Sequence, residues 1–390
     1  MKILFVHDHV MRKYNNDFFS TGGLSNEVFQ RYLEKDDEIY VYTRVKNITD
    51  KENKLIQVNG NNVICKPSNI YHKPIDYYIK KRKLRQEVNA RLTNIDFCII
   101  RLQSMLGSIV LEEVKKKNIP YIIEMVACPW DSLWNYGGIK AKLFAPIIYM
   151  KTKKQVKDAK NVIYVSEKFL QERYPTKGNQ ISCSNVNIQK VKDEVLNNRI
   201  QKIEHMKNQS KFRIGLVGSL NVNFKGHSTA IKALSLLKQK YDVELHFLGA
   251  GDKNKWIPFI KKCNVEENVF FDGVLPSGEP VYKWMDELDI FLIPSLQEGL
   301  PRALIEAMSR GCPAIGVKTG GIPELLDERY VCKRKDYKSI AKKISELLED
   351  KDIMIDQAEK NFHKAQNYTK DILNERRKNF FKQIYRKIKN

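Results

Sequence analysis

Two glutamates, Glu298 and Glu306, stand eight positions apart, directly after the apolar run Ile290–Ile293. The run predicts a buried strand, and Pro301 and Gly311 predict the first residue and the end of the helix that follows it. Glu298 is therefore expected in the turn between strand and helix, and Glu306 inside the helix. Carboxylates placed in this way accept hydrogen bonds from hydroxyl groups, so that Glu298 would bind a sugar and Glu306 a ribose.

The backbone between these glutamates is predicted to bind an anion. The first N–H groups of a helix have no partner within the helix, and the helix dipole adds positive charge at that end. The N–H groups from Gly299 to Ala303 therefore favour a phosphate in the crevice above the strand ends. The ligand-binding residues predicted in this stretch are Glu298, Gly299, Leu300, Arg302, Ala303 and Glu306.

A second strand with a glycine-containing loop precedes this stretch. The run Ile214–Leu220 predicts a strand that ends in a loop, and Lys225 and Gly226 lead into a helix that continues through Leu237. A lysine in such a loop makes a charge-assisted contact with a phosphate, and the Ser219 hydroxyl can donate a further hydrogen bond.

The rest of the chain alternates short apolar runs with helical patterns, which predicts an α/β fold with doubly wound, mainly parallel sheets. A loop from Asp8 to Thr21 is expected after the first strand, leading to Gly22 and Gly23, where the backbone can approach a phosphate or sugar closely. Further strands are predicted at Ile3–Val6, Ile39–Thr43, Phe97–Leu102, Tyr121–Met125, Val162–Val165, Val243–Leu248 and Val269–Leu275.

Length, charge and cysteine usage limit the class of protein. A chain of 390 residues suggests two or three domains, each large enough for a core. The net charge is +22, and residues 51–200 hold 27 Lys and Arg against 13 Asp and Glu, which suits a nucleic acid, an anionic membrane or an acidic substrate. Seven scattered cysteines without a C-x-x-C pair are typical of reduced thiols in a cytosolic protein.

No targeting or membrane-spanning segment is predicted. The run Met1–Val6 is too short for a signal peptide, and Leu143–Met150 has only eight residues, whereas a span needs about 20. The protein is therefore expected in the cytoplasm. Two basic helices are predicted within Pro74–Leu92 and Lys140–Lys160; they are either solvated charged faces or a surface for an anionic membrane.

The stretch around the two glutamates resembles the E-x7-E motif of the group 1, family 4 retaining nucleotide-sugar glycosyltransferases. The run Gly320–Glu324 is similar to the next loop of that family, and the loop that ends in Lys225 and Gly226 is similar to its phosphate-binding loop. The resemblance extends over the whole chain and is strongest from 212 to 326. It implies the GT-B fold, in which two Rossmann-like domains face an interdomain cleft.

The resemblance assigns roles to residues on the nucleotide side of that cleft. Lys225 matches the phosphate-binding lysine, whereas Ser219 stands where many members carry an arginine. The backbone at Gly273 and Val274 would meet the nucleotide base. Gly22 and Gly23 follow the first strand, as the glycine loop of the family's first domain does.

On the other side of the cleft, many members place a histidine beside the donor sugar. This chain has no histidine between His72 and His205, and Glu124 or Asp131 is expected in comparable space. The predicted catalytic set is therefore Glu298, Lys225 and Glu124. His7 and His9 have a spacing found in metal sites but no companions, so they are expected as loop residues and no metal is expected.

The reaction implied by the resemblance retains the anomeric configuration and needs neither metal nor cofactor. The donor would be a nucleotide sugar, with a UDP-sugar favoured over a GDP-sugar, and the acceptor a saccharide, in particular a lipid-linked one. Such enzymes act in bacterial surface polysaccharide pathways, such as capsule, O-antigen or exopolysaccharide synthesis. The resemblance thus implies a peripheral protein that acts at the inner face of the cell membrane.

The predicted domains are an acceptor-binding domain over 1–190, a linker over 191–210 and a nucleotide-sugar domain over 211–369. A final helix over 370–390 is expected to cross back onto the first domain. Two other classes of protein remain open. A GT-B-fold sugar-nucleotide epimerase shares the architecture, and a nucleic-acid-binding protein would explain the charge, although the basic helices lack a pattern of stacking aromatic residues.

Overall fold

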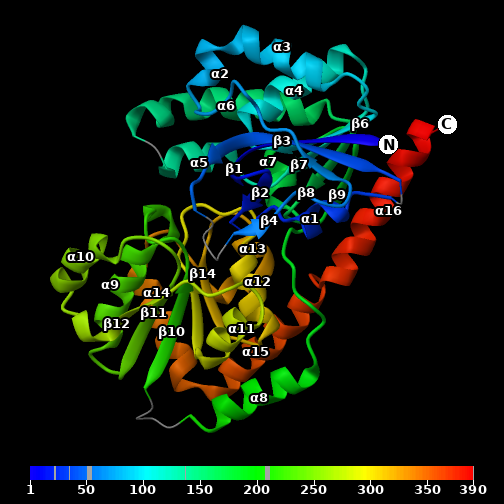
Figure 1. The fold of residues 1–390 in the computed structure, drawn as a ribbon. Helices are drawn as coiled ribbons and strands as arrows, with labels where there is room; N and C mark the ends of the chain where they lie inside the picture. Colours follow the sequence, from blue (N-terminus) through cyan, green and yellow to red (C-terminus); the bar gives the residue numbers. More distant parts are fainter. Residues whose placement is uncertain (22, 35, 51–54, 137, 207–210, 390) are drawn as a thin grey trace.

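The structure, a computed structural model, describes the chain except residues 22, 35, 51–54, 137, 207–210 and 390. Two α/β domains lie one above the other, with the N-terminal domain at the top of Figure 1 and the C-terminal domain below it. Each domain has a central sheet covered by helices on both faces.

Within the described residues, nine strands form the N-terminal sheet, whose parallel part runs in the order β5-β3-β1-β6-β7-β8-β9. The short strands β2 and β4 extend it in the antiparallel sense. The strands are β1 (Lys2–Tyr14), β2 (Asp17–Ser20), β3 (Glu38–Asn47), β4 (Ile56–Gln57), β5 (Val63–Cys65), β6 (Phe97–Leu102), β7 (Tyr121–Met125), β8 (Asn161–Tyr164) and β9 (Asn179–Ser182).

The helices of this domain connect its strands, and several of them bury apolar side chains in the core. In α4, for example, the Ser104 side chain caps the helix, while Leu106, Val110 and Val114 are buried. The helices are α1 (Asn26–Gln30), α2 (Asp76–Ile79), α3 (Lys81–Arg91), α4 (Met105–Lys116), α5 (Pro129–Tyr136), α6 (Ile139–Lys157) and α7 (Phe169–Arg173).

The C-terminal sheet is parallel and runs in the order β12-β11-β10-β13-β14-β15. The order of the strands reverses between β10 and β13, and open α/β sheets bind ligands outside the carboxyl ends of the strands at such a point. The strands are β10 (Phe212–Val217), β11 (Val243–Leu248), β12 (Val269–Gly273), β13 (Ile290–Ile293), β14 (Ala314–Val317) and β15 (Val331–Cys332).

The helical elements of the C-terminal domain cover both faces of this sheet (Figure 1). The α-helices are α8 (Asp193–Glu204), α9 (His227–Leu237), α10 (Ile257–Lys262), α11 (Glu279–Glu287), α12 (Arg302–Ser309), α13 (Ile322–Leu325), α14 (Tyr337–Glu349) and α15 (Lys351–Gln366). The 3-10 turns are η1 (Asn223–Lys225), η2 (Lys253–Lys255), η3 (Glu266–Asn268) and η4 (Glu328–Tyr330).

The helix between the two domains, α8, and the last helix of the chain, α16, each pack against one domain. In α8, the buried guanidinium of Arg199 donates hydrogen bonds to the carbonyls of Met285 and Leu288, so this helix is attached to the C-terminal domain. The final helix α16 (Lys370–Lys389) runs back along the N-terminal domain, as Figure 1 shows. There the Tyr385 hydroxyl donates to the carbonyl of Tyr32 over 3.1 Å.

The loop predicted from Asp8 to Thr21 is wrong, because the first strand continues and folds into a hairpin. Beyond Val6, β1 bulges and then pairs with β3 as far as Lys13, and β2 pairs back onto it. Asn15 takes a positive φ of 52° in the tight turn, a conformation that asparagine tolerates. His7 and His9 consequently lie in a strand and not in a loop.

Two predicted helix boundaries also change. The basic helix expected over Pro74–Leu92 is two helices, α2 and α3, because Lys80 leaves helical geometry between them. Pro301 is the residue before α12, with extended backbone, and not its first helical residue. The expected end at Gly311 is confirmed by its φ of +60°.

A buried ion pair joins two central strands of the N-terminal sheet. Arg101 in β6 and Glu124 in β7 are register partners, and the guanidinium donates to Glu124 Oε2 at 2.8 and 2.9 Å. The Tyr32 hydroxyl donates to the other oxygen over 2.7 Å. Burial alone would raise the pKa of Glu124, but the charge of Arg101, with those of two further arginines, holds this pKa well below its usual range.

We expect Arg101→Met to destabilise the protein by about 3–5 kcal/mol, because the substitution leaves a buried carboxylate without its main partner. The loss is measured as a shift of the urea midpoint, with tryptophan fluorescence as the probe. Since the pKa of Glu124 is depressed in the folded state, the wild-type advantage is full at neutral pH. It declines as the pH falls below the ordinary glutamate value of about 4.3.

The matched control is Arg85→Met, which breaks the partly exposed pair of Arg85 with Glu112 at the surface and should cost about 1 kcal/mol. Equal midpoints for the two variants at neutral pH would show that the buried pair does not stabilise the domain.

Candidate active site

Lys225 and Glu298 meet at the carboxyl ends of β10 and β13, where the strand order reverses. The Lys225 ammonium donates to Glu298 Oε1 over 2.6 Å, and the two side chains are 26% and 11% exposed. Lys225 comes from η1, after β10, and Glu298 from the turn between β13 and α12. The residues that the sequence placed in two separate loops therefore form one cation–carboxylate pair.

Close backbone packing brings these two loops together. A side chain at Gly226, whose φ is +83°, would place its Cβ 2.3 Å from the carbonyl oxygen of Pro294. Beside it, the Leu296 N–H donates to the carbonyl of Phe224 over 2.6 Å. The absence of a Cβ at Gly226 thus lets the chain before α9 lie directly on the loop after β13.

The loop after β14 supports the backbone of Glu298 from another side. The Gly321 N–H donates to the carbonyl of Gly299 over 2.7 Å. Gly320 has a φ of +56°, and a Cβ there would lie 2.3 Å from the carbonyl oxygen of Glu298. We call Gly320–Glu324 the Gly-Gly loop. Its two glycines have a physical reason, which is close contact between two backbones.

The start of α12 offers unpaired donors beside this pair. Among the described residues, no protein group accepts a hydrogen bond from the backbone N–H groups of Gly299, Leu300, Arg302 or Ala303. These donors lie at the positive end of the helix dipole, which is where an anion is stabilised. The geometry therefore supports a phosphate position next to Lys225.

Glu306 lies further along α12 and is largely enclosed. Burial raises the pKa of its carboxyl, and the charge of Arg302, one turn earlier, offsets only part of that effect. Within the described parts of the chain, its carboxylate makes no hydrogen bond. Such a carboxylate is free to accept hydrogen bonds from a ligand's hydroxyl groups.

The remaining predicted residues of the C-terminal domain lie along the same edge of the sheet. Ser219 follows β10, and its hydroxyl accepts a hydrogen bond from the Asn221 N–H over 3.4 Å. Gly273 and Val274 are exposed at the end of β12, with Gly273 at a φ of +73° and open space beside it. Because β12 is two strands from β10, they lie about 10 Å from the Ser219 loop.

The N-terminal domain contacts the site through α5. The Asn135 side chain donates to the carbonyl of Leu296 over 3.0 Å, and the Gln297 amide donates to the Ser132 hydroxyl over 2.6 Å. These contacts hold the turn that carries Glu298 against the other domain. Sequence reasoning missed Ser132, Asn135 and Gln297, because nothing in their local pattern indicates a partner more than 150 positions away.

Glu324 forms a second bridge between the domains. Its carboxylate accepts hydrogen bonds from the N–H groups of Glu167 and Phe169 at 2.6 Å and of Lys168 at 3.1 Å. The sequence placed Glu324 in the motif but gave it no role. Its position at the end of the loop Gly320–Glu324 was the available signal, and its partners Glu167 to Phe169, at the start of α7, were not visible.

The two carboxylates that were candidates for the N-terminal side of the site are buried in ion pairs. Glu124 is buried, and both of its oxygens are used by Arg101 and Tyr32, so the geometry does not support its predicted catalytic contact. Asp131, the other candidate, is buried in an ion pair with Arg173 at 3.0 Å. Gly23 is exposed near α1, while the prediction for Gly22 lies outside the described residues.

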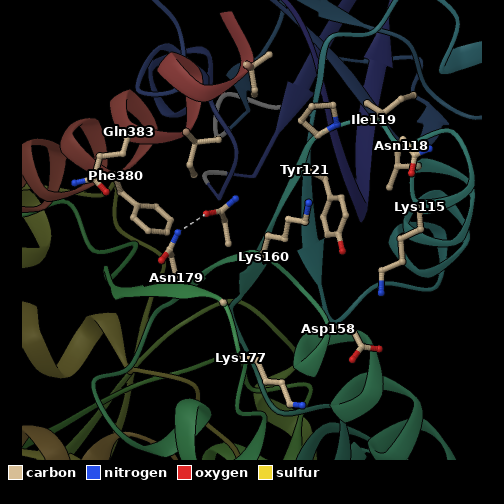
Figure 2. Close-up of a pocket in the computed structure, with 16 residues that line it drawn as sticks. Lys115, Asn118, Ile119, Tyr121, Asp158, Lys160, Lys177, Asn179, Phe380 and Gln383 are labelled. Carbon is tan, nitrogen blue, oxygen red and sulfur yellow. Dashed lines mark hydrogen bonds between the residues drawn. The ribbon is translucent and has the colours of Figure 1, made fainter. Parts of the chain in front are cut away.

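A large cavity elsewhere on the N-terminal domain is separate from this site. Its volume is about 930 Å³, and Figure 2 shows Lys115, Tyr121, Lys160 and Phe380 among the side chains around it. Tyr121 begins β7, so the cavity lies at the amino ends of the strands and under α16. Ligand crevices of such sheets lie at the opposite, carboxyl ends.

The described residues contain no group of three or more His, Cys, Asp or Glu side chains that would hold a metal ion. His7 and His9 contact each other, as the His9 N–H donates to His7 Nδ1 over 3.2 Å. The chain has one D-x-D sequence, Asp350 to Asp352, and there Asp350 caps α15 by accepting from the Ile353 N–H.

The two facing Rossmann-like domains, with the Lys225–Glu298 pair at their boundary, have the architecture of a GT-B glycosyltransferase. The chain belongs to the group 1 glycosyltransferases: the family model "Glycosyl transferases group 1" matches residues 211–350. "Protein CapJ" of Staphylococcus aureus is 34% identical over 347 residues, which are 88% of this chain and 86% of that protein. The family resemblance and the fold class predicted from the sequence are confirmed.

Other comparisons agree with this assignment. The "Amylovoran biosynthesis glycosyltransferase AmsK" of Erwinia amylovora is 38% identical over 111 residues, 26% of this chain and 27% of that protein. Sucrose-phosphate synthase of Thermosynechococcus elongatus has the same fold, with a TM-score of 0.72, 14% identity and 98% coverage of both chains. The structure of Anabaena HepE in complex with UDP matches with a TM-score of 0.66 and 15% identity, over 98% of this chain and 100% of that one.

We expect the two members of the Lys225–Glu298 pair to differ in their effect on UDP binding. Lys225→Ala should weaken UDP binding and turnover, because a charge-assisted contact of about 1.5–3 kcal/mol is lost. Glu298→Gln should lower turnover by about two to three orders of magnitude. It should leave UDP binding intact, because Lys225 is then free of its carboxylate partner. Isothermal titration with UDP and initial rates give both quantities.

Glu287→Gln is the matched control for Glu298→Gln, because it changes an exposed glutamate of the same domain whose partner is Arg213. Wild-type turnover in Glu298→Gln, or unaltered UDP binding in Lys225→Ala, would contradict the assignment of the pair to the active site.

Proposed function

We propose that this protein is a retaining glycosyltransferase that moves a sugar from a nucleotide sugar to a saccharide acceptor. A UDP-sugar is the favoured donor, with a GDP-sugar as the alternative, and the acceptor is lipid-linked. The observation that carries the proposal is the Lys225–Glu298 pair beside the unpaired N–H groups of α12. These groups supply a cation and backbone donors for the diphosphate and a carboxylate for the sugar.

The proposed reaction depends on stabilising the charge of the departing diphosphate. As the bond from the anomeric carbon to the phosphate oxygen breaks, negative charge grows on the phosphate and positive charge on the sugar ring. Lys225 and the start of α12 stabilise the phosphate charge without a metal or cofactor. Glu298 orients the sugar. The acceptor hydroxyl attacks from the side that the diphosphate leaves and gives its proton to that phosphate, so no enzyme nucleophile is needed.

The nucleotide is proposed to lie along the carboxyl edge of the C-terminal sheet. Glu306 would bind the ribose and the backbone at Gly273 and Val274 the base, with the Ser219 hydroxyl near the phosphates. HepE has the same fold, and its structures are described with UDP and with UDP-glucose. That description supports a UDP-sugar for this chain.

The proposed pathway is the synthesis of a bacterial surface polysaccharide, such as a capsule, an O-antigen or an exopolysaccharide. Relatives named for capsular polysaccharide, amylovoran and colanic acid biosynthesis support it. No helix among the described residues is long and apolar enough to cross a membrane. We propose that the reaction takes place in the cytoplasm, with the protein held peripherally at the inner face of the cell membrane.

The donor is tested by thermal shift against a panel of UDP- and GDP-sugars, since a ligand that binds the folded state raises the melting temperature by mass action. We expect one UDP-sugar to give the largest shift, and the same shift in excess chelator. Transfer to a lipid-linked acceptor should also survive the chelator. Loss of transfer that Mg²⁺ or Mn²⁺ restores would contradict the metal-free reaction, and conversion of the donor to its epimer without an acceptor would indicate an epimerase.

A pH dependence tests the role of Glu306. Because burial raises the pKa of this carboxyl, it becomes protonated at a higher pH than an ordinary glutamate, for which the value is about 4.3. UDP affinity should therefore fall as the pH decreases towards that raised pKa, because the neutral acid accepts hydrogen bonds less well. Glu306→Gln should bind UDP more weakly at neutral pH and lose this dependence. A wild-type pH profile in the variant would exclude Glu306 as the titrating group.

A further inference from the structure

The exposed large apolar side chains of this protein are concentrated on one part of the N-terminal domain. Among the described residues, 15 large apolar side chains are exposed, and nine of them lie between Ile75 and Met150. They belong to the segment of α2, to α5 and to α6. Monomeric proteins rarely leave a contiguous apolar surface to water, so such a surface indicates contact with another phase or partner.

Helix α6 has its apolar side turned away from the protein. Ile139, Leu143, Ile147 and Met150 recur at intervals of four, four and three residues, which places them on one side of the helix. They are 79%, 70%, 61% and 63% exposed. The side of α6 that packs on the domain is a different one, with Ala145, Thr152, Gln155 and Val156 buried. Packing within this chain does not explain the apolar side.

Helix α2 adds to the same surface. The Lys151 ammonium in α6 donates to the Tyr77 hydroxyl in α2 over 2.9 Å, so the two helices are in contact. Figure 1 shows them side by side at the outer end of the N-terminal domain. Ile79, two positions after Tyr77 at the end of α2, is 73% exposed. We call the surface formed by Ile79, Ile139, Leu143, Phe144, Ile147 and Met150 the α2–α6 face.

Exposed lysines and an arginine surround the α2–α6 face. Lys80 to Lys83 continue from α2 into α3, and Lys140, Lys142 and Lys154 lie on α6, all of them exposed. Apolar side chains with a basic border are typical of helices that lie in the interface of an anionic bilayer. A second copy of this chain is a poorer partner, because two such faces in contact would bring their lysines together.

We infer that the α2–α6 face inserts its apolar side chains into an anionic lipid bilayer, while the surrounding lysines contact the headgroups. The inference goes beyond the electrostatic attachment that the charge of the sequence alone suggests, since the contact has an apolar part. It rests on the proposed function for its purpose, which is to hold the enzyme where a lipid-linked acceptor is located.

The α2–α6 face is connected to the active site through α5. The Lys142 ammonium lies 5.7 Å from the ring centre of Trp134, which is itself partly exposed. The next residue, Asn135, donates to the carbonyl of Leu296, two positions before Glu298. A protein bound to a membrane through this face therefore holds the side of its cleft that α5 forms near the bilayer surface.

The experiment compares three variants of the full-length protein with the wild type. The apolar variant carries Ile139→Gln, Leu143→Gln, Ile147→Gln and Met150→Gln. The basic variant carries Lys80→Gln, Lys81→Gln, Arg82→Gln and Lys83→Gln. The matched control carries Leu236→Gln, Ile257→Gln, Phe270→Gln and Ile372→Gln, which change exposed apolar residues outside the face.

Each protein is sedimented with vesicles of phosphatidylcholine containing increasing fractions of phosphatidylglycerol, at low and at high salt. The wild type and the control should bind, increasingly with phosphatidylglycerol, and part of the binding should survive high salt because apolar contacts are not screened. The apolar variant should lose about tenfold or more in affinity and keep no salt-resistant binding. Brominated lipids should quench tryptophan fluorescence in the wild type more than in the apolar variant.

Three results would overturn the inference. The wild type could fail to bind any vesicle, or the apolar variant could bind as the wild type does while only the basic variant loses binding. Light scattering could also show a wild-type dimer that the apolar variant dissociates, with no vesicle binding, which would make a second copy the partner.

A separate readout distinguishes failure of the inference from failure of the proposed function. The apolar variant should keep the thermal shift with the UDP-sugar and its rate with a lipid-free acceptor, but lose rate with an acceptor embedded in vesicles. Vesicle binding without any nucleotide-sugar binding would refute the proposed function and leave the membrane contact in place. An unchanged rate with the embedded acceptor would refute the purpose that we assign to the face.

Discussion

The close approach of two loops at the switch point of the C-terminal sheet is the constraint on which the site depends. Gly226 lets the backbone before α9 lie against Pro294, and this contact brings Lys225 within 2.6 Å of Glu298. A side chain at position 226 would push the two loops apart, and Lys225 and Glu298 could then not act together on the proposed nucleotide sugar. Unpaired charges are costly in partly buried surroundings. The pair avoids this cost when no ligand is bound, because the lysine and the more deeply buried carboxylate neutralise each other.

The N-terminal domain supports this arrangement through its interior and through the cleft. Arg101 and Glu124 connect its central strands, and α16 packs against the domain near Tyr32, whose hydroxyl also bonds to Glu124. Between the domains, contacts from α5 and from the start of α7 reach the turn of Glu298 and the Gly-Gly loop. The elements that hold the two domains together therefore also hold the turn that carries Glu298.

The sequence predicted best what depends on local physics. Phe97–Leu102 and Tyr121–Met125 match β6 and β7 at both ends, because buried parallel strands read as continuous apolar runs. The hairpin after Val6 was missed since its strand is held by pairing with β3, although Asn15 and Asn16 were a turn signal. Glu124 was misplaced because its register partner, Arg101, lies 23 positions away on another strand. A linear pattern does not show such pairings.

The orientation of α6 was likewise not predictable from a linear pattern. The sequence revealed the lysines of this helix but not which side of it faces the domain, and that orientation decides whether the apolar side chains form a core or a surface. Recognition of the proposed donor would depend on the partly buried charges of Lys225 and Glu298, which salt screens weakly. Binding to the membrane of a lipid-linked acceptor would depend on apolar area, which salt does not screen, and on exposed lysines, which salt does screen. Under the proposed function, ionic strength would therefore change the location of the enzyme more than its donor binding.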